Sequence, residues 1–157
     1  MTLVTEAGFT HRFPFRVYYE DTDAGGIVYY ANYLRFFERG RTEYLRAIGV
    51  VQQELRRDHS LIFAVRSCDI EYLAPALLDD SLHVVTEIRA IGASRLDMAQ
   101  FIRHEERVLT TGRITVVAIG VDGKAKRIPD FLRQKILPLI VPAQEGKGNF
   151  NDGNTGG

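Results

Sequence analysis

The chain has 157 residues, enough for one folded domain that buries a hydrophobic core. Lysine plus arginine and aspartate plus glutamate number 20 each, so there is no net charge to attract nucleic acid or an acidic membrane. We therefore expect partners to be recognised through local contacts, with no nucleic acid among them.

The cysteine content and the apolar runs bear on the compartment. The one cysteine, Cys68, cannot form an intrachain disulfide, and its apolar surroundings predict a small core residue. This fits a reducing compartment, so we expect a cytoplasmic location. We expect no secretory signal, since no basic start precedes an apolar stretch, and no spanning membrane segment, since no run reaches 18 apolar residues.

The first elements are a strand, a loop and a long helix. Residues 1–10 are expected to be a flexible N-terminus, and alternating apolar residues then predict a strand over residues 13–19. Residues 20–26 combine three carboxylates with two glycines and predict a loop. Apolar residues at helical spacing predict a helix of about 17 residues, roughly 25 Å long, that ends near Gly49. Gly40 in its middle is locally costly and indicates close approach of the helix to a strand.

The rest of the chain is dominated by strands. A short helix is expected over residues 52–57, followed by strands over residues 62–73, 81–91, 94–104 and 108–120. The short connectors between the last three strands predict antiparallel hairpins. A short helix is expected over residues 129–137, and residues 141–157 are expected to form a disordered tail.

One long helix cannot cover both faces of a five-stranded sheet. We therefore expect the other face of the sheet, or one of its edges, to meet a second copy of the chain. The folded domain is expected to span residues 11–140.

The loop at residues 20–26 is the strongest candidate for chemistry. The chain has no phosphate-binding glycine loop and no serine-nucleophile motif, and its four histidines lack metal-ligand spacing, so neither a metal nor a cofactor is expected. The helix that follows the loop would present unpaired N–H groups beside the carboxylates, which suits hydrolysis of an activated acyl group. Acidic residues before a helix are also common helix caps, and the residues alone favour that alternative.

The sequence of this region matches a known signature. Residues 17–29 read Val-Tyr-Tyr-Glu-Asp-Thr-Asp-Ala-Gly-Gly-Ile-Val-Tyr, and the later runs 71–76 and 78–80 fit the same pattern. The match resembles the 4-hydroxybenzoyl-CoA thioesterase family, most closely its YbgC-like branch, over about residues 11–135. Between these runs the matching residues are Ala31, Tyr33, Phe37, Glu38, Arg41, Thr42 and Glu43.

The resemblance implies an α+β hotdog fold, in which a five-stranded antiparallel sheet wraps around one long helix. It implies dimers, often paired into homotetramers, and metal-free hydrolysis of acyl-CoA thioesters at subunit interfaces. The family's catalytic aspartate falls on Asp23, which leaves Glu20 and Asp21 as supporting loop residues. The expected substrate-binding residues are Gly26, Ile27, Val28, Ala31, Asn32 and Tyr33.

The chain departs from the YbgC-like pattern at one position. Members of that branch usually carry a histidine seven residues after the aspartate, where this chain has Tyr30. A tyrosine is not a base near neutral pH. The pattern here resembles the bacterial 4-hydroxybenzoyl-CoA thioesterase instead, in which the backbone N–H of a tyrosine polarises the thioester carbonyl. We therefore assign Tyr30 a catalytic role through its peptide N–H, with a short-chain or aromatic acyl-CoA as substrate.

Two rival functions stay open. A hotdog hydratase or dehydratase is disfavoured because no histidine accompanies Asp23. The other rival is a non-catalytic module that binds acyl carrier protein or lipid-synthesis enzymes and is linked to phospholipid synthesis or the Tol-Pal system. The missing histidine makes this second rival more credible. Nucleophile and general base both remain possible roles for Asp23. Basic residues that could hold the CoA phosphates are scattered and unassigned: Arg95, Arg103, Arg113, Lys124, Lys126 and Arg127.

Overall fold

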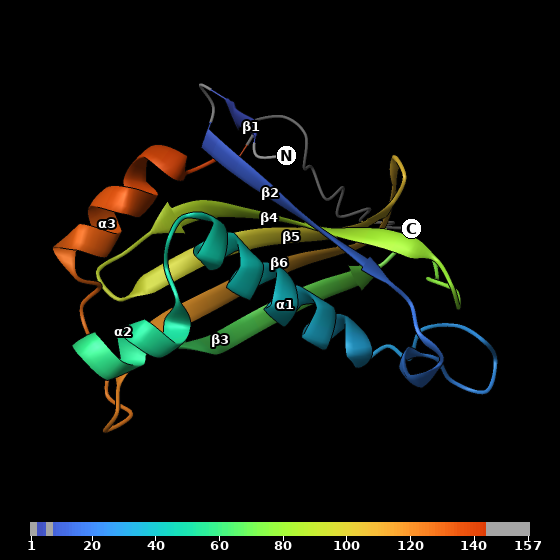
Figure 1. Cartoon of the computed structure of the whole chain (residues 1–157), viewed down its shortest axis with the longest axis horizontal. Coiled ribbons are helices and arrows are strands. Elements are labelled where there is room, and N and C mark those ends of the chain that lie inside the picture. Colours follow the sequence, from blue (N-terminus) through green and yellow to red (C-terminus); the bar gives the residue numbers. More distant parts are fainter. Residues whose placement is uncertain (1–2, 6–7, 144–157) are drawn as a thin grey trace, which may run out of the picture.

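The computed structural model describes residues 3–5 and 8–143 and contains one antiparallel sheet with three α-helices (Figure 1). The strand order in the sheet is β1-β2-β4-β5-β6-β3. The strands are β1 (Leu3–Thr5), β2 (Gly8–Arg16), β3 (Leu61–Tyr72), β4 (Ser81–Ile91), β5 (Arg95–His104) and β6 (Arg107–Gly120). The helices are α1 (Asn32–Ala47), α2 (Gln52–His59) and α3 (Asp130–Ile136), with short 3₁₀ turns η1 (Tyr19–Asp21) and η2 (Leu137–Leu139).

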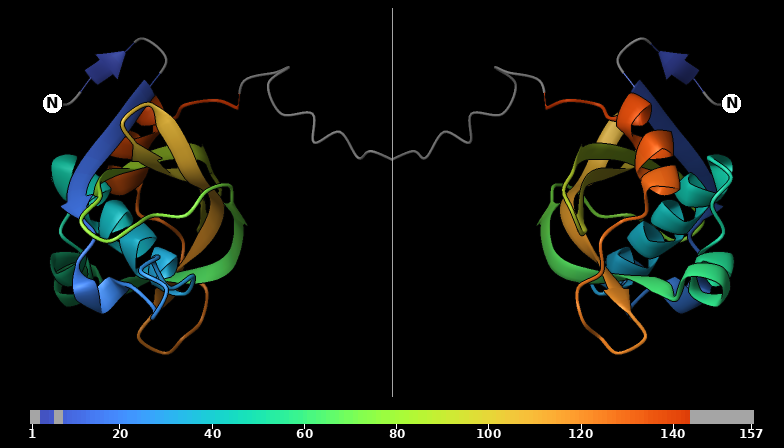
Figure 2. Two further views of the ribbon diagram at one scale, coloured as in Figure 1. Left: turned by 90° about the vertical axis from the view of Figure 1, so that its right-hand side faces the viewer. Right: turned by 90° about the vertical axis from the view of Figure 1, so that its left-hand side faces the viewer.

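The sheet curves around α1, which lies on its concave face (Figure 2). This is the hotdog arrangement that the resemblance implies, with the five expected strands and the short β1 as a sixth. The observed bounds of α1, α2 and strands β3 to β6 agree with the predicted ranges to within two residues at each end. The 3.6-residue and two-residue periods in the sequence were therefore sufficient to locate these elements.

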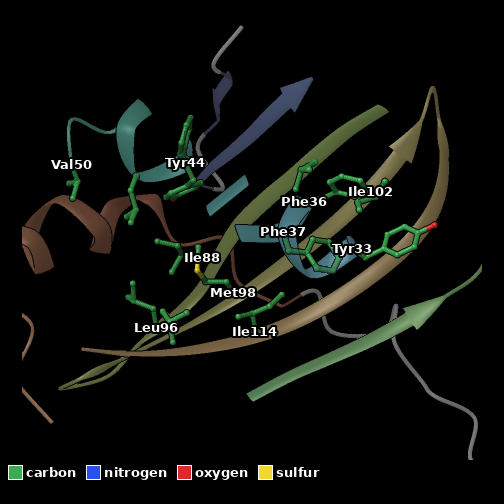
Figure 3. Packing of buried hydrophobic residues seen from close by; sticks show 14 of the residues in the cluster. Tyr33, Phe36, Phe37, Tyr44, Val50, Ile88, Leu96, Met98, Ile102 and Ile114 are labelled. Atoms are coloured by element: carbon green, nitrogen blue, oxygen red, sulfur yellow. The ribbon is translucent and has the colours of Figure 1, made fainter. Parts of the chain in front are cut away.

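The core lies between α1 and the inner face of the sheet (Figure 3). Phe36, Phe37 and Tyr44 on α1 are almost fully buried, as their helical spacing predicts. They pack with inward-facing residues of the strands, since alternate residues of a strand point to one face. Buried residues of β4, β5 and β6 in this cluster include Val84, Ile88, Leu96, Met98, Ile102 and Ile114.

Gly40 is the point of closest approach between α1 and the sheet. A Cβ atom at this position would lie 2.5 Å from Val84 Cγ1 and 3.0 Å from Gln100 Nε2. Gln100, which is fully buried, donates hydrogen bonds from Nε2 to the backbone oxygen of Phe37 and to Thr86 Oγ1, each at 2.9 Å. The close approach predicted for this glycine is confirmed, and it allows a strand side chain to hydrogen-bond the helix backbone.

The N-terminal part of the sheet differs from the prediction. The first strand was expected over residues 13–19, but β2 runs from Gly8 to Arg16, and β1 pairs with its first three residues. The flexible segment expected over residues 1–10 thus contains β1 and the start of β2. Pro14 lies in the stretch of β2 that pairs only with β4, which a residue without an N–H tolerates. Residues 17–19 leave the sheet because η1 begins at Tyr19.

The opposite edge of the sheet is formed by β3, which pairs with β6 alone among the described strands. A bulge between Val65 and Ser67 places one extra residue, Arg66, at the middle of this 12-residue strand. Val65 pairs with the buried Val116 and shares its face, yet 52% of Val65 is exposed. Cys68, expected in the core, is half-buried on the inner face of this edge strand and is a free thiol.

The C-terminal helix α3 forms as predicted, although Pro129 is its N-cap residue instead of its first helical residue. Leu132 and Ile136 of α3 are fully buried in the core cluster. Of the tail expected over residues 141–157, residues 144–157 lie outside the described residues. No helix within 3–5 and 8–143 is long and apolar enough to cross a membrane.

Substitution Gly40→Ala should destabilise the protein although alanine favours helices by about 1 kcal/mol over glycine. The added methyl group would collide with Val84 and press on the Gln100 amide. Overpacking of this kind costs about 2 kcal/mol net, which lowers the melting temperature by about 4 to 8 °C. Thermal unfolding followed by circular dichroism measures the shift. The exposed neighbour Arg39→Ala is the control and should unfold within about 2 °C of the wild type. A Gly40→Ala variant as stable as this control would contradict the close approach of α1 to the sheet at Gly40.

Candidate active site

The loop that joins β2 to α1 is built around Asp21. Its carboxylate Oδ2 accepts a hydrogen bond from the Tyr18 N–H at 2.8 Å, which closes η1. Its backbone oxygen accepts two more, from the Tyr29 N–H at 3.0 Å and from Asn32 Nδ2 at 2.9 Å. Asp21 therefore ties the entry of the loop to its exit, in agreement with the supporting role expected for it.

Asp23 lies at the tip of this loop. Its N–H donates to the Ile27 backbone oxygen at 2.9 Å, and its own backbone oxygen accepts from the Gly26 N–H at 3.1 Å. Gly26 has a φ of +79°, the left-handed conformation that the paired glycines predicted. The Asp23 side chain is exposed, and Oδ1 accepts from the Gly25 N–H at 2.8 Å. Oδ2 accepts no hydrogen bond from any residue in the described part of the chain.

The start of α1 has no side-chain cap. Its N-cap residue is Ala31, which cannot accept a hydrogen bond, and the first turn contains no acidic residue. Within the described ranges the N–H groups of Tyr30 and Ala31 have no acceptor. Such orphan donors, together with the positive end of the helix dipole, favour an oxygen that carries or develops negative charge.

The uncapped start bears on one of the two interpretations of the acidic loop, that its carboxylates cap α1. Asp21 closes η1, Asp23 closes its own turn, and neither carboxylate hydrogen-bonds the first turn of α1. Neither carboxylate therefore caps α1, although Asp21 does cap the short 3₁₀ helix η1. The loop holds one carboxylate with a free oxygen near one end of a helix whose donors are open.

A group of tyrosines lies against the helix start. The Tyr30 ring centroid is 4.9 Å from that of Tyr29 and 6.4 Å from that of Tyr72, and Tyr30 is 62% exposed. The Tyr72 hydroxyl donates to the Tyr30 backbone oxygen at 3.1 Å. A hydrogen bond to Tyr30 raises the pKa of Tyr29, and burial raises the pKa of Tyr33 and of Tyr72. These three hydroxyls stay protonated at neutral pH, so none of them is a base there.

The expected substrate-binding residues lie in one region of the structure, but they differ in how far they are exposed to solvent. Gly26, Ala31 and Asn32 are half-buried and Ile27 is exposed, whereas Val28 and Tyr33 are buried. The Tyr33 hydroxyl accepts the Ala76 N–H at 3.2 Å, and the Asn32 amide is bound to the loop. Both polar groups therefore hold the protein's own backbone.

Sequence reasoning did not assign Tyr72 to the site. It belongs to the matching run 71–76, but its place beside Tyr30 results from β3 ending at the helix start, a contact between residues 42 positions apart. In the described part of the chain, no three His, Cys, Asp or Glu side chains lie close enough to hold a metal ion.

Comparison with known proteins places this site in a family. Residues 17–136 match the family described as the thioesterase-like superfamily. The acyl-CoA thioesterase YbgC of Haemophilus influenzae is 43% identical over 116 residues, which cover 74% of this chain and 85% of that protein. The acyl-CoA thioester hydrolase YbgC of Escherichia coli is 45% identical over 134 residues, which cover 85% and 93% respectively.

Solved structures share the fold. A probable thioesterase from Bartonella henselae is 40% identical, with a TM-score of 0.74 over 76% of this chain and 99% of that chain. A gentisyl-coenzyme A thioesterase is 27% identical, with a TM-score of 0.73 over 78% and 99%. The fold, the acidic loop before α1 and these relatives agree: the chain belongs to the thioesterase-like superfamily, in its YbgC-like branch, and is a thioester hydrolase.

Proposed function

We propose that the protein hydrolyses a short-chain or aromatic acyl-CoA to CoA and the free acid, with Asp23 and the Tyr30 N–H as its catalytic groups. The observation that carries this proposal is the junction between the loop and α1. It combines a carboxylate oxygen and two N–H donors that have no hydrogen-bond partner among the described residues. The YbgC relatives, named as acyl-CoA thioester hydrolases, support CoA thioesters as the substrate class.

In the proposed reaction the thioester oxygen binds at the Tyr30 N–H, where the helix dipole stabilises the charge that develops on it. Asp23 acts in one of two ways. As a nucleophile its oxygen attacks the carbonyl carbon, the C–S bond breaks and CoA leaves as the thiolate; water then hydrolyses the mixed anhydride, which releases the acid and restores the Asp23 carboxylate. As a general base it removes a proton from water, the hydroxide attacks, and the departing CoA sulfur receives the proton.

The tyrosines beside the helix start support a small or aromatic acyl group. Tyr29, Tyr30 and Tyr72 present partly exposed rings next to the donors. Aromatic rings pack favourably against another ring in offset or edge-on geometry. Gly26, Ile27 and Val28 would shape the loop side of the acyl site, and Ala31, Asn32 and Tyr33 would shape its helix side.

We also propose that the protein is a cytoplasmic homo-oligomer in which the β3 edges of two copies pair. An edge strand of 12 residues presents a row of unpaired backbone groups, which proteins cover or block. Val65 and Tyr72 on the inner face of β3 and Leu34 on α1 are about half exposed, as apolar residues at an uncovered interface would be. The free thiol of Cys68 suits a reducing compartment.

Substitution Asp23→Asn should lower kcat by about 100-fold or more, because an amide neither attacks a thioester nor takes a proton from water. Thiol release measured over acyl-CoAs of several chain lengths and one aromatic acyl-CoA tests this expectation. Glu20→Gln is the matched control, since Glu20 is exposed on the same loop and its side chain makes no hydrogen bond or ion pair with another described residue. Both variants should unfold within about 2 °C of the wild type. Equal rates for Asp23→Asn and the wild type would refute the assignment.

Substitution Tyr30→Phe should leave kcat within about threefold of the wild type, because the peptide N–H proposed to polarise the carbonyl is unchanged. The hydroxyl is the only group removed, and it hydrogen-bonds its neighbour Tyr29 instead of the backbone. The same thiol-release assay gives the result. A loss as large as that of Asp23→Asn would assign the chemistry to the phenol and overturn the backbone role.

Substitution Val65→Lys should convert the oligomer to monomers, because it places a charge at the middle of the paired edges. Sedimentation velocity at micromolar concentration measures the assembly. Leu137→Lys is the control, since Leu137 is also 52% exposed but lies in η2, away from β3. A wild-type protein that sediments only as a monomer would contradict the proposal.

A further inference from the structure

The Tyr72 hydroxyl joins the sheet to the start of α1, and the proposed reaction gives this hydroxyl no role. Tyr72 is the last residue of β3, whose end lies beside the first turn of α1 (Figure 1). The hydroxyl donates to the Tyr30 backbone oxygen at 3.1 Å. That oxygen also accepts the Tyr33 N–H, but at 3.4 Å, which is long for a backbone hydrogen bond. The side chain from the sheet is therefore the closer partner of this carbonyl.

The Tyr30 oxygen belongs to the same peptide group as the Ala31 N–H. A peptide bond joins the C=O of one residue to the N–H of the next in one planar, conjugated unit. A hydrogen bond to the oxygen of this unit polarises it, which makes its N–H a stronger donor, and also holds its plane in one orientation. The Ala31 N–H has no acceptor among the described residues. The contact from Tyr72 therefore strengthens and aims a donor that is open to a ligand.

The preceding peptide group is arranged in the same way. Its oxygen, on Tyr29, accepts the Asn32 N–H at 2.9 Å, and its N–H, on Tyr30, has no acceptor among the described residues. Ala31 has helical backbone angles, with φ at −69° and ψ at −20°. Successive N–H groups at the start of a helix point in the same direction along its axis. Two neighbouring peptides thus have bound oxygens and open N–H groups that can meet one acceptor.

Tyr72 is held in place by the strand behind it and by a ring beside it. The N–H groups of Leu73 and Ala74 both donate to the Leu109 backbone oxygen, at 2.9 Å and 3.1 Å, which fixes the end of β3 to β6. The Tyr72 ring lies edge-on to the Tyr33 ring, with centroids 5.2 Å apart. Burial raises the pKa of Tyr72, so its hydroxyl stays protonated and remains a donor at neutral pH. A donor fixed in this way needs no rearrangement during the reaction.

We propose that Tyr72 is a positioning residue for thioester hydrolysis, whose hydroxyl orients and polarises the Tyr30–Ala31 peptide so that the Ala31 N–H is a second donor to the thioester oxygen. This inference rests on the proposed function and adds one donor to the Tyr30 N–H. When the carbonyl carbon is attacked, negative charge develops on its oxygen and both N–H groups stabilise that charge. The contact strengthens as the charge grows, so it lowers the barrier more than it raises substrate affinity.

Substitution Tyr72→Phe should lower kcat about tenfold and leave KM within about twofold of the wild type, because the second donor is weakened but not removed. The ring is kept, so the unfolding temperature should stay within about 2 °C. Tyr19→Phe is the matched control and should keep the wild-type kcat. Tyr19 is 83% exposed on η1, and its hydroxyl bonds no residue that the structure describes. An unchanged kcat in Tyr72→Phe, or a raised KM alone, would overturn the proposal.

An ester in place of the Tyr30–Ala31 amide tests whether Tyr72 acts through this N–H. Cell-free translation with lactic acid at position 31 replaces the N–H by an oxygen and keeps the methyl side chain. The ester should lower kcat about 100-fold, because it removes one donor outright. Tyr72→Phe should then cost less than about twofold on the ester background, since the group on which it acts is gone. A tenfold loss on both backgrounds would place the effect of Tyr72 elsewhere and overturn the proposal.

Infrared spectroscopy of a bound thioester separates failure of the Tyr72 role from failure of the proposed function. The Asp23→Asn variant is mixed with an aromatic acyl-CoA that carries a carbon-13 label at the thioester carbonyl. Donors on the oxygen should lower the carbonyl stretching frequency, and adding Tyr72→Phe should reverse part of this shift, whereas adding Tyr19→Phe should not. A full shift in both double variants would overturn the Tyr72 role alone. No shift in any of these proteins would overturn the proposed function, and this inference with it.

Discussion

The contact on which the rest of the structure depends is the hydrogen-bonded crossing of α1 over the sheet at Gly40. The buried Gln100 amide donates to the Phe37 backbone oxygen and to Thr86, and it accepts from Arg41 Nη1 at 3.0 Å. A buried amide satisfied on both sides is costly to shift, because any sliding of the helix leaves a polar group unpaired. The crossing thus fixes α1 along its axis and determines where its uncapped first turn emerges.

The first turn of α1 can offer its N–H donors to a ligand because the loop before it is held together by its own hydrogen bonds. Asp21 joins both ends of the loop through its carboxylate and its backbone oxygen, so the loop does not need the helix donors to hold its shape. The N–H groups of Tyr30 and Ala31 remain available as a result. Open donors on a fixed scaffold need no reorganisation when charge develops on a bound oxygen, which is the basis of electrostatic catalysis.

Most of the fold could be predicted from the sequence, and so could the loop that holds the candidate site, whereas the catalytic roles of its residues stay predictions. Helix α1 and strands β3 to β6 follow periodic patterns that depend on burial, and Asp23, Gly26 and Tyr30 lie within one continuous run. The early start of β2 was missed, because Gly8 to Arg12 join the sheet through backbone pairing without an alternating pattern. Tyr72 was also missed, since its place beside Tyr30 depends on where β3 ends in space, which no local signal encodes.

The proline in β2 bears on how the sheet can grow. Beyond Thr10 the outer side of β2 has no neighbouring strand in the described part of the chain, and Pro14 leaves that stretch without one of its N–H groups. A strand added there would meet an interrupted ladder, whereas β3 offers a long one. The two edges of the sheet therefore differ in their capacity to pair with another strand. Copies that join through β3 form a closed dimer, because the β2 edges left outside do not extend the sheet further. A single imino acid far from the catalytic loop would thus help to keep this β-rich protein from polymerising into fibres.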